Sequence, residues 1–319
     1  MRGTGLQRGG SFRQGGKSFS ASGTAPIIYG ITVDDISNIS GIVTSIEALP
    51  YHPTVRVVFD QGEPADYYKS AIQAIKATGA FVMGELLDSY YEGGESGTPT
   101  TTEQLSVLTT SYLETLGTLV DIWEVGNEVN GNWTEQPNPN TWDGSYSLVN
   151  AKLAEAYNLV AAQGYPTALT LYANYTAGDG PLELSPEAFS ATQVPDYIRN
   201  GLNYVLLSYY EQDNNSVRPT PQVWASHFGS LRTLYPNAWQ GFGEIGLDGT
   251  VTSATLGTAQ SIASYYYGLI PSYTGGSVPL PYYCGGYFWW YWYEDCIPDT
   301  TAFFPSIHDG FIAEKNALG

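Results

Sequence analysis

The chain has 319 residues, of which 43% are hydrophobic and 13% charged, and this composition is typical of a globular protein with a full core, not of a disordered one. Its 12 basic residues against 31 acidic ones give a net charge of −19, which argues by Coulomb repulsion against nucleic acid or anionic membrane surfaces as partners. No apolar run approaches the roughly 20 residues of a membrane span, so no membrane insertion is expected.

The first residues, 1–26, differ in composition from the rest of the chain. They hold four of the 12 basic residues, are rich in Gly, Ser and Gln, and precede the first acid, Asp34. They lack the apolar central region of a secretory signal. We predict a flexible tail here, with one alternative: a basic arm that docks onto the acidic body of a neighbouring subunit and supports self-association. Residues 27–319 are predicted to form a single domain.

Short β-rich runs recur along the chain and alternate with longer segments of helical periodicity. Eight such runs lie at residues 27–33, 54–60, 80–88, 121–128, 167–174, 203–210, 240–247 and 286–294. Helical patterns lie between them at residues 65–79, 102–120, 147–164, 220–235 and 254–270. A further helix near residues 186–201 is interrupted by Pro195, and the last is faint at residues 310–319.

Regular alternation of strands and helices demands a parallel sheet, and eight repeats close most naturally into a (β/α)8 barrel. The sequence therefore predicts an α/β fold of the TIM-barrel class. The alternative is an open doubly wound sheet. That fold would be expected to have a glycine-rich phosphate-binding loop after an early strand, and the sequence IYGITVDD at residues 28–35 does not match such a loop.

Polar residues are concentrated where the predicted strands end, and (β/α)8 barrels carry their functional groups at these ends. Two carboxylates belong to opposed strands: Glu128 ends the fourth run and Glu244 lies in the seventh. Such a pair, facing each other across the barrel mouth, suits cleavage of a glycosidic bond. Retention requires carboxyl groups roughly 5 Å apart, whereas inversion requires roughly 6.5 to 9.5 Å. The strand positions favour the shorter separation.

These motifs resemble the clan A retaining (β/α)8 glycoside hydrolases. The resemblance rests on five features in strand order: the arginine of TVRVVFD, the Asn-Glu of WEVGNE, the tyrosine of LLSYYEQ, the glutamate of GFGEIG and a tryptophan-rich last strand. Within this clan, the sequence resembles family 5 and the endo-β-1,4-galactanases. The Ser-Tyr-Tyr and Val-Gly-Asn-Glu phrases look closer to the galactanases, and the exact family stays open.

The resemblance implies a role for each matched residue. Glu128 would be the acid/base and Glu244 the nucleophile. Asn127 would bind the 2-hydroxyl of the sugar in the cleavage subsite. Arg56 would keep Glu244 ionised, because a nearby positive charge lowers the pKa of a carboxyl.

A tyrosine at the end of the sixth strand would hydrogen-bond the nucleophile. Tyr209 and Tyr210 are both candidates, but successive strand residues point to opposite faces, so only one can point inward and Tyr210 is preferred. Three further acids, Glu85, Glu211 and Glu294, are interpreted as acceptors for substrate hydroxyls or as solvated groups.

Aromatic and amide side chains near the strand ends are expected to bind substrate. The candidates are Trp289, Trp290, Trp292, Trp133, Trp142 and Asn174. Consecutive tryptophans on one strand cannot all face inward, so one of the three in the last run is predicted to stack on a sugar face.

The two cysteines, Cys284 and Cys296, lie twelve residues apart around an aromatic run. A disulfide between them is expected, and it would favour an oxidising compartment such as that of a secreted protein. Two thiols without clustered histidines make a poor metal site, so neither a metal nor another cofactor is expected.

Together these observations predict a retaining, endo-acting hydrolase of β-linked polysaccharide, such as mannan, glucan or galactan. Two alternatives remain. One is an exo-acting β-glycosidase of the same clan, and the other is a glycan-binding or self-assembling extracellular scaffold built on a glycosidase-like barrel.

Overall fold

The structure, a computed structural model, describes residues 26–60, 62–87, 101–131, 145–173, 184–273, 276 and 278–317. The predicted tail lies outside the described residues except for Pro26, and its proposed docking role stays a prediction. Three of the predicted substrate contacts, Trp133, Trp142 and Asn174, also lie outside the described residues.

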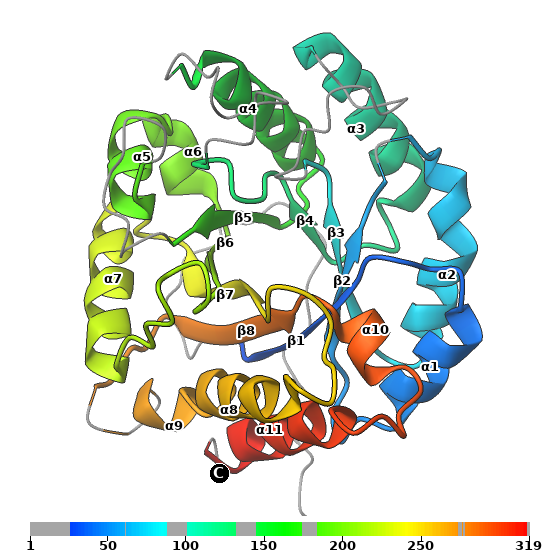
Figure 1. The fold of residues 1–319 in the computed structure, drawn as a ribbon. Helices are drawn as coiled ribbons and strands as arrows, with labels where there is room; N and C mark the ends of the chain where they lie inside the picture. The colour runs from blue at the N-terminus through cyan, green and yellow to red at the C-terminus, as the bar shows by residue number, and fades with distance from the viewer. Residues whose placement is uncertain are drawn as a thin grey trace, which may run out of the picture.

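Eight parallel strands close into one barrel in the order in which they occur in the chain. They are β1 (Ile28–Val33), β2 (Thr54–Val58), β3 (Phe81–Glu85), β4 (Ile122–Glu124), β5 (Thr167–Tyr172), β6 (Tyr204–Tyr209), β7 (Trp239–Ile245) and β8 (Tyr283–Trp289). Figure 1 shows the strands at the centre with the helices arranged around them. The predicted (β/α)8 fold is confirmed.

The helices connect successive strands and cover the outside of the barrel (Figure 1). They are α1 (Ile39–Glu47), α2 (Ala65–Ala77), α3 (Thr102–Leu116), α4 (Ser147–Ala162), α5 (Pro186–Thr192), α6 (Asp196–Gly201), α7 (Pro221–Leu234), α8 (Leu256–Tyr266), α9 (Ile270–Tyr273), α10 (Trp292–Cys296) and α11 (Phe304–Ala317). Within the described ranges, no helix combines the length and apolar character that crossing a bilayer requires.

Local sequence signals explain where several helices begin. Thr101 and Gln104 form a capping box at the start of α3, and Thr220 caps α7 just before a proline at its first turn. Pro195 separates α5 from α6, as its position in the sequence predicted, because proline cannot donate a helical hydrogen bond.

The last strand begins three residues earlier than predicted and ends five residues earlier, so the end of the predicted run forms a turn and the first residues of α10 instead. In β8, Gly285 and Gly286 have positive φ angles of 79° and 97°, followed by Tyr287 at 71° and Phe288 at 30°. This irregular backbone is invisible to a search for alternating residues, which is why the aromatic run was misassigned.

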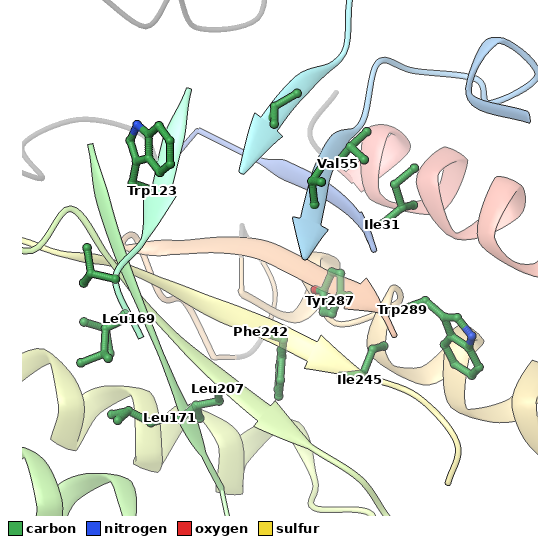
Figure 2. Packing of buried hydrophobic residues seen from close by; sticks show 14 of the residues in the cluster. Ile31, Val55, Trp123, Leu169, Leu171, Leu207, Phe242, Ile245, Tyr287 and Trp289 are labelled. Carbon is green, nitrogen blue, oxygen red and sulfur yellow. The ribbon is translucent and has the colours of Figure 1, made fainter. Parts of the chain in front are cut away.

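Side chains alternate between two apolar layers, one outside and one inside the barrel. Outward residues such as Val55, Leu169 and Phe242 pack beneath the helices, as Figure 2 shows. A smaller inner cluster lies near the starts of the strands; it comprises Ile28, Met83, Ile122, Ala168, Tyr204, Leu206, Trp239, Cys284 and Phe288. The inner cluster closes the lower end of the barrel, so polar inward residues gather in its upper half.

The predicted disulfide is wrong, because both cysteines are free and buried. Cys284 belongs to the inner cluster near the start of β8, whereas Cys296 ends α10 and packs in the outer layer. A disulfide requires Cα atoms about 4.4 to 6.8 Å apart, and the length of β8 separates the two residues.

The C-terminal helix buries an unpaired acid in its packing against the barrel. Glu314, on α11, is fully buried, and neither of its carboxyl oxygens has a hydrogen-bond partner among the described residues. Burial raises its pKa well above the ordinary value of 4.5. The titratable groups that Glu314 affects are Tyr29, Tyr267, Tyr283, Tyr287 and Cys284; they too have raised pKa values and supply no positive charge.

We expect the Glu314→Gln variant to be more stable than the wild type at neutral pH. Because the folded pKa exceeds the unfolded one, stability is fully present below pH 4.5 and falls as pH rises towards the folded pKa, by about 1.4 kcal/mol per unit of difference. Urea denaturation of both proteins from pH 4 to pH 9 measures this. Parallel pH dependence of the two proteins would contradict a protonated Glu314.

Candidate active site

The upper half of the barrel holds a buried guanidinium surrounded by carboxylates. The side chain of Arg56, on β2, is 0% exposed. Its Nε donates to Oε2 of Glu124 at 2.7 Å, and its Nη1 donates to Oε2 of Glu244 at 2.8 Å. Nη2 lies 3.1 Å from Oε2 of Glu85. These four residues, called the Arg56 cluster below, join strands β2, β3, β4 and β7.

The carboxylates hold Arg56 in its charged form. Burial alone lowers the pKa of the guanidinium, but the charges of Glu124, Glu85 and Glu244 outweigh burial and raise it well above its ordinary value. The other oxygen of Glu124 accepts a hydrogen bond from Oγ1 of Thr170, on β5. With three acids to one base, removal of the cation would leave buried carboxylates without compensation.

A β-bulge in β7 brings Glu244 into the barrel. Phe242 faces outward and pairs with Leu207, but the next pair is Ser208 with Glu244, so the register slips by one residue at Gly243. Strict alternation after Phe242 would direct Glu244 outward. The bulge reverses this and places Glu244 beside an inward residue of β6.

Glycine is required at the bulge because of its neighbours. A Cβ atom on Gly243 would lie 2.3 Å from Oγ1 of Thr170 and 3.0 Å from Cβ of Leu206. Any other residue would therefore push Thr170 away from the carboxylate that it holds. The bulge thus turns Glu244 inward, and its glycine leaves room for Thr170 to hold Glu124.

Tyr210 provides a second hydrogen bond to Glu244. It follows β6 and faces inward, and its hydroxyl donates to Oε1 of Glu244 at 2.7 Å. Burial raises the pKa of Tyr210 well above 10, with further contributions from Glu244 and Glu128, while Arg56 acts in the opposite direction. The hydroxyl therefore remains protonated and remains a donor.

Glu128 lies beyond the end of β4 in a conformation that is uncommon for its residue type. Its φ angle is 47°, in the left-handed region, and its N–H donates to the carbonyl of Thr170 at 2.9 Å. Oε1 of Glu128 accepts a hydrogen bond from Oγ of Ser208. The side chains of Glu128 and Glu244 both influence Tyr210, and the two residues are 8% and 5% exposed. Strain of this kind is concentrated at functional sites.

Two predicted substrate-binding residues flank this pair. Asn127 is 1% exposed, its N–H donates to the carbonyl of Leu87 at 2.9 Å, and its Oδ1 has no partner among the described residues. Trp290 is half-buried, and the guanidinium carbon of Arg56 lies 5.3 Å from the centroid of its ring.

Solved structures with the same arrangement of strands and helices include several carbohydrate-active enzymes. A glycoside hydrolase family 5 enzyme from Prevotella bryantii matches with a TM-score of 0.58 at 13% identity, over 94% of this chain and 94% of that one. A GH10 xylanase from a Bispora species, solved with xylobiose, matches with a TM-score of 0.56 at 14% identity, over 92% and 97%. An endo-1,4-beta-mannanase from Rhizomucor miehei matches with a TM-score of 0.54 at 13% identity, over 89% of each chain.

The chain has the fold of the clan A glycoside hydrolases. At these identities the likeness extends to the fold alone, and it assigns no family within the clan. No protein-family model and no curated protein sequence matches the chain.

Tyr209 faces away from the site, so its predicted contact with substrate is wrong. Its hydroxyl donates to the carbonyl of Val217 at 2.9 Å, and its ring packs edge-on against Trp224 with centroids 4.9 Å apart. The alternation along β6 that directs Tyr210 inward places Tyr209 beneath the helices.

Of the three tryptophans among which one sugar platform was predicted, two are buried structural residues. Trp289 is fully buried, donates from Nε1 to Oδ2 of Asp295 at 2.8 Å, and packs against Phe303 with centroids 4.5 Å apart. Figure 2 shows it at the end of β8. Trp292 begins α10 and is also fully buried. Of the three, Trp290 alone retains an exposed ring surface.

The three further acids have different environments. Glu85 belongs to the Arg56 cluster, and Glu211 forms a two-point pair with Arg218, at 2.6 and 3.0 Å, so neither is a solvated group. Glu294 is exposed, and partial desolvation of its carboxyl together with the charge of Asp34 raises its pKa to about 7. In the part of the chain that the structure describes, no group of three or more His, Cys, Asp or Glu side chains is arranged to hold a metal ion.

Two residues of the site were not singled out from the sequence. Glu124 accepts a hydrogen bond from Arg56, and Ser208 donates one to Glu128. Alternation carried a signal for Glu124, because Trp123 faces outward and its neighbour must then face the same interior as Arg56. Ser208 precedes an outward tyrosine by one residue and is inward by the same rule.

Proposed function

We propose that the chain is a retaining glycoside hydrolase that cleaves β-linked polysaccharide within the chain of sugars. The observation that carries the proposal is the environment of Glu244, whose two carboxyl oxygens are held by Arg56 and by Tyr210 beside a second carboxyl, that of Glu128. Double displacement needs one ionised carboxyl as the nucleophile and a second carboxyl as the acid. Here Arg56 favours the ionised form of Glu244, and Glu128 accepts a hydrogen bond from a hydroxyl.

In the first step, the carboxylate of Glu244 attacks the anomeric carbon, and the bond from that carbon to the glycosidic oxygen breaks. Glu128 gives its proton to the departing oxygen, so that the leaving sugar departs as an alcohol. The product is a glycosyl ester of Glu244. Arg56 supports this step because its positive charge favours the ionised nucleophile.

In the second step, a water molecule replaces the leaving sugar. The carboxylate of Glu128 removes a proton from this water while the oxygen attacks the anomeric carbon, and the ester bond to Glu244 breaks. Glu244 recovers its negative charge, and the hydroxyl of Tyr210 again donates to it. Two inversions at the same carbon give retention.

Substrate binding is assigned to Asn127, Trp290 and Glu294. The buried Oδ1 of Asn127 offers an acceptor for a sugar hydroxyl, and the ring of the half-buried Trp290 offers an apolar face for a pyranose. With a pKa of about 7, Glu294 can donate or accept a hydrogen bond at neutral pH. The xylanase and mannanase folds among the structural neighbours support a β-linked polymer as substrate.

The direct test is hydrolysis of purified mannan, β-glucans, galactan and xylan, followed by proton NMR of the products during the first minutes. We expect cleavage of at least one polymer with the β-anomer formed first. An α-anomer formed first would contradict retention. If none of the polymers is cleaved while aryl β-glycosides are hydrolysed, the exo-acting alternative is favoured.

A further inference from the structure

The hydroxyl of Ser208 reaches Glu128 from the strand next to the one that carries Glu244. Ser208 is fully buried on β6, and its Oγ donates to Oε1 of Glu128. In the β6–β7 register, the same residue pairs with Glu244. Ser208 therefore links β6, the neighbour of the strand that carries Glu244, to the carboxyl of Glu128.

We propose that Ser208 is a positioning residue that fixes Glu128 for its acid/base role, an inference that rests on the proposed function. A hydroxyl that donates a hydrogen bond to Oε1 restricts rotation of the carboxyl and holds its other oxygen, Oε2, in one direction. A carboxylate accepts a stronger hydrogen bond than a neutral carboxyl, so the contact also favours the ionised form of Glu128. Ser208 thereby eases release of the proton in the first step.

The titration of Glu128 can be interpreted because Tyr210 and Arg56 keep their protonation states. Glu128 and Glu244 both affect the pKa of Tyr210, and Glu244 belongs to the Arg56 cluster with Glu124 and Glu85. Tyr210 keeps its proton and Arg56 its charge because both pKa values are raised well above their ordinary values. Serine itself does not titrate, so the loss of its hydrogen bond changes no charge.

The test compares Ser208→Ala with the wild type in the pH profile of kcat/KM. We expect the basic limb, which reports the acid, to move upward by about one pH unit, because one charge-assisted hydrogen bond is lost. Turnover of aryl glycosides with poor leaving groups should fall about tenfold, whereas that of dinitrophenyl glycosides should change little, since their leaving group needs no proton.

Two matched variants separate positioning from packing. Ser208→Thr retains the hydroxyl and should return the basic limb to the wild-type position. Ser190→Ala removes the hydroxyl of another fully buried serine, on α5 and outside the site, and should leave the basic limb where it is. A uniform loss of kcat/KM in Ser208→Ala, with both limbs unmoved, would overturn the inference in favour of a structural role.

A second readout does not depend on activity. The carboxyl ¹³C shift of Glu128, assigned with the Glu128→Gln variant, is followed against pH in the wild type and in Ser208→Ala. A higher midpoint in Ser208→Ala supports the inference, and equal midpoints refute it. If Ser208→Ala does not fold, Ser208→Cys, whose thiol is a weak donor, gives the same comparison. A wild type that hydrolyses no glycoside would refute the proposed function, while this titration would still decide the contact.

Discussion

We expect the Glu244→Ala variant to lose hydrolysis by at least about 10⁴-fold, because the side chains of the other two carboxylates of the Arg56 cluster, Glu85 and Glu124, are 0% exposed and cannot reach a substrate. Sodium azide should restore turnover of dinitrophenyl β-glycosides, since the small anion fits the space left by the carboxylate. The azide attacks once, so the product should be a glycosyl azide of inverted configuration. Product NMR identifies the anomer.

The matched variant is Glu128→Ala. It should also lose turnover of poor leaving groups, but azide should then intercept the ester of Glu244 and give a glycosyl azide of retained configuration. Inverted azide from Glu128→Ala would exchange the two roles. Unimpaired hydrolysis by both variants would place the reaction elsewhere on the barrel. Thermal unfolding of each variant checks that the fold survives.

The second large effect is expected from Arg56→Met, which removes the cation and keeps an unbranched side chain. At neutral pH we expect the free energy of unfolding to fall by about 3 to 5 kcal/mol, because Glu85, Glu124 and Glu244 lose their common partner while they remain buried. Activity should also be lost, because Glu244 no longer has a neighbouring positive charge to keep it ionised.

The pH dependence distinguishes lost charge from lost packing in Arg56→Met. Without the cation, the buried carboxyls are expected to have folded pKa values above their unfolded ones. Their stability contribution is then present at low pH and is lost as pH rises. The difference from the wild type should therefore grow from pH 4 to pH 8 in urea denaturation. A constant difference would indicate a packing defect. Arg56→Lys, which keeps the charge but not the three-way geometry, should lie between the two proteins.

Much of the barrel was predictable because its signals are local. Hydrophobic periods of two and of about 3.6 residues marked the strands and most of the helices, and their alternation specified a parallel sheet. The same reasoning located Arg56, Glu128 and Glu244 on three different strands, and the structure brings them to one end of the barrel. Alternation also selected Tyr210 over Tyr209, since a strand residue and its successor face opposite sides.

Errors arose where the backbone departs from a regular strand. Positive φ angles at Gly285 and Gly286 make β8 irregular, so its bounds were predicted at residues 286–294 and Cys284 was placed outside the strand. The expected disulfide is wrong for a different reason, because the length of β8 separates the two cysteines. A sequence interval of twelve residues says nothing about distance when a strand and a short helix lie between the two thiols.

By itself the sequence determined that eight strands alternate with helices and that Glu128 and Glu244 lie close to the ends of the fourth and seventh strands, because these are properties of neighbouring residues. Only the tertiary structure decided that Glu244 faces inward, since this depends on a one-residue slip between β6 and β7 at Gly243. It also decided that Glu124 holds Arg56 and that Ser208 holds Glu128. These contacts join residues 68 and 80 positions apart, and their geometry is set by strand register, which no local pattern encodes.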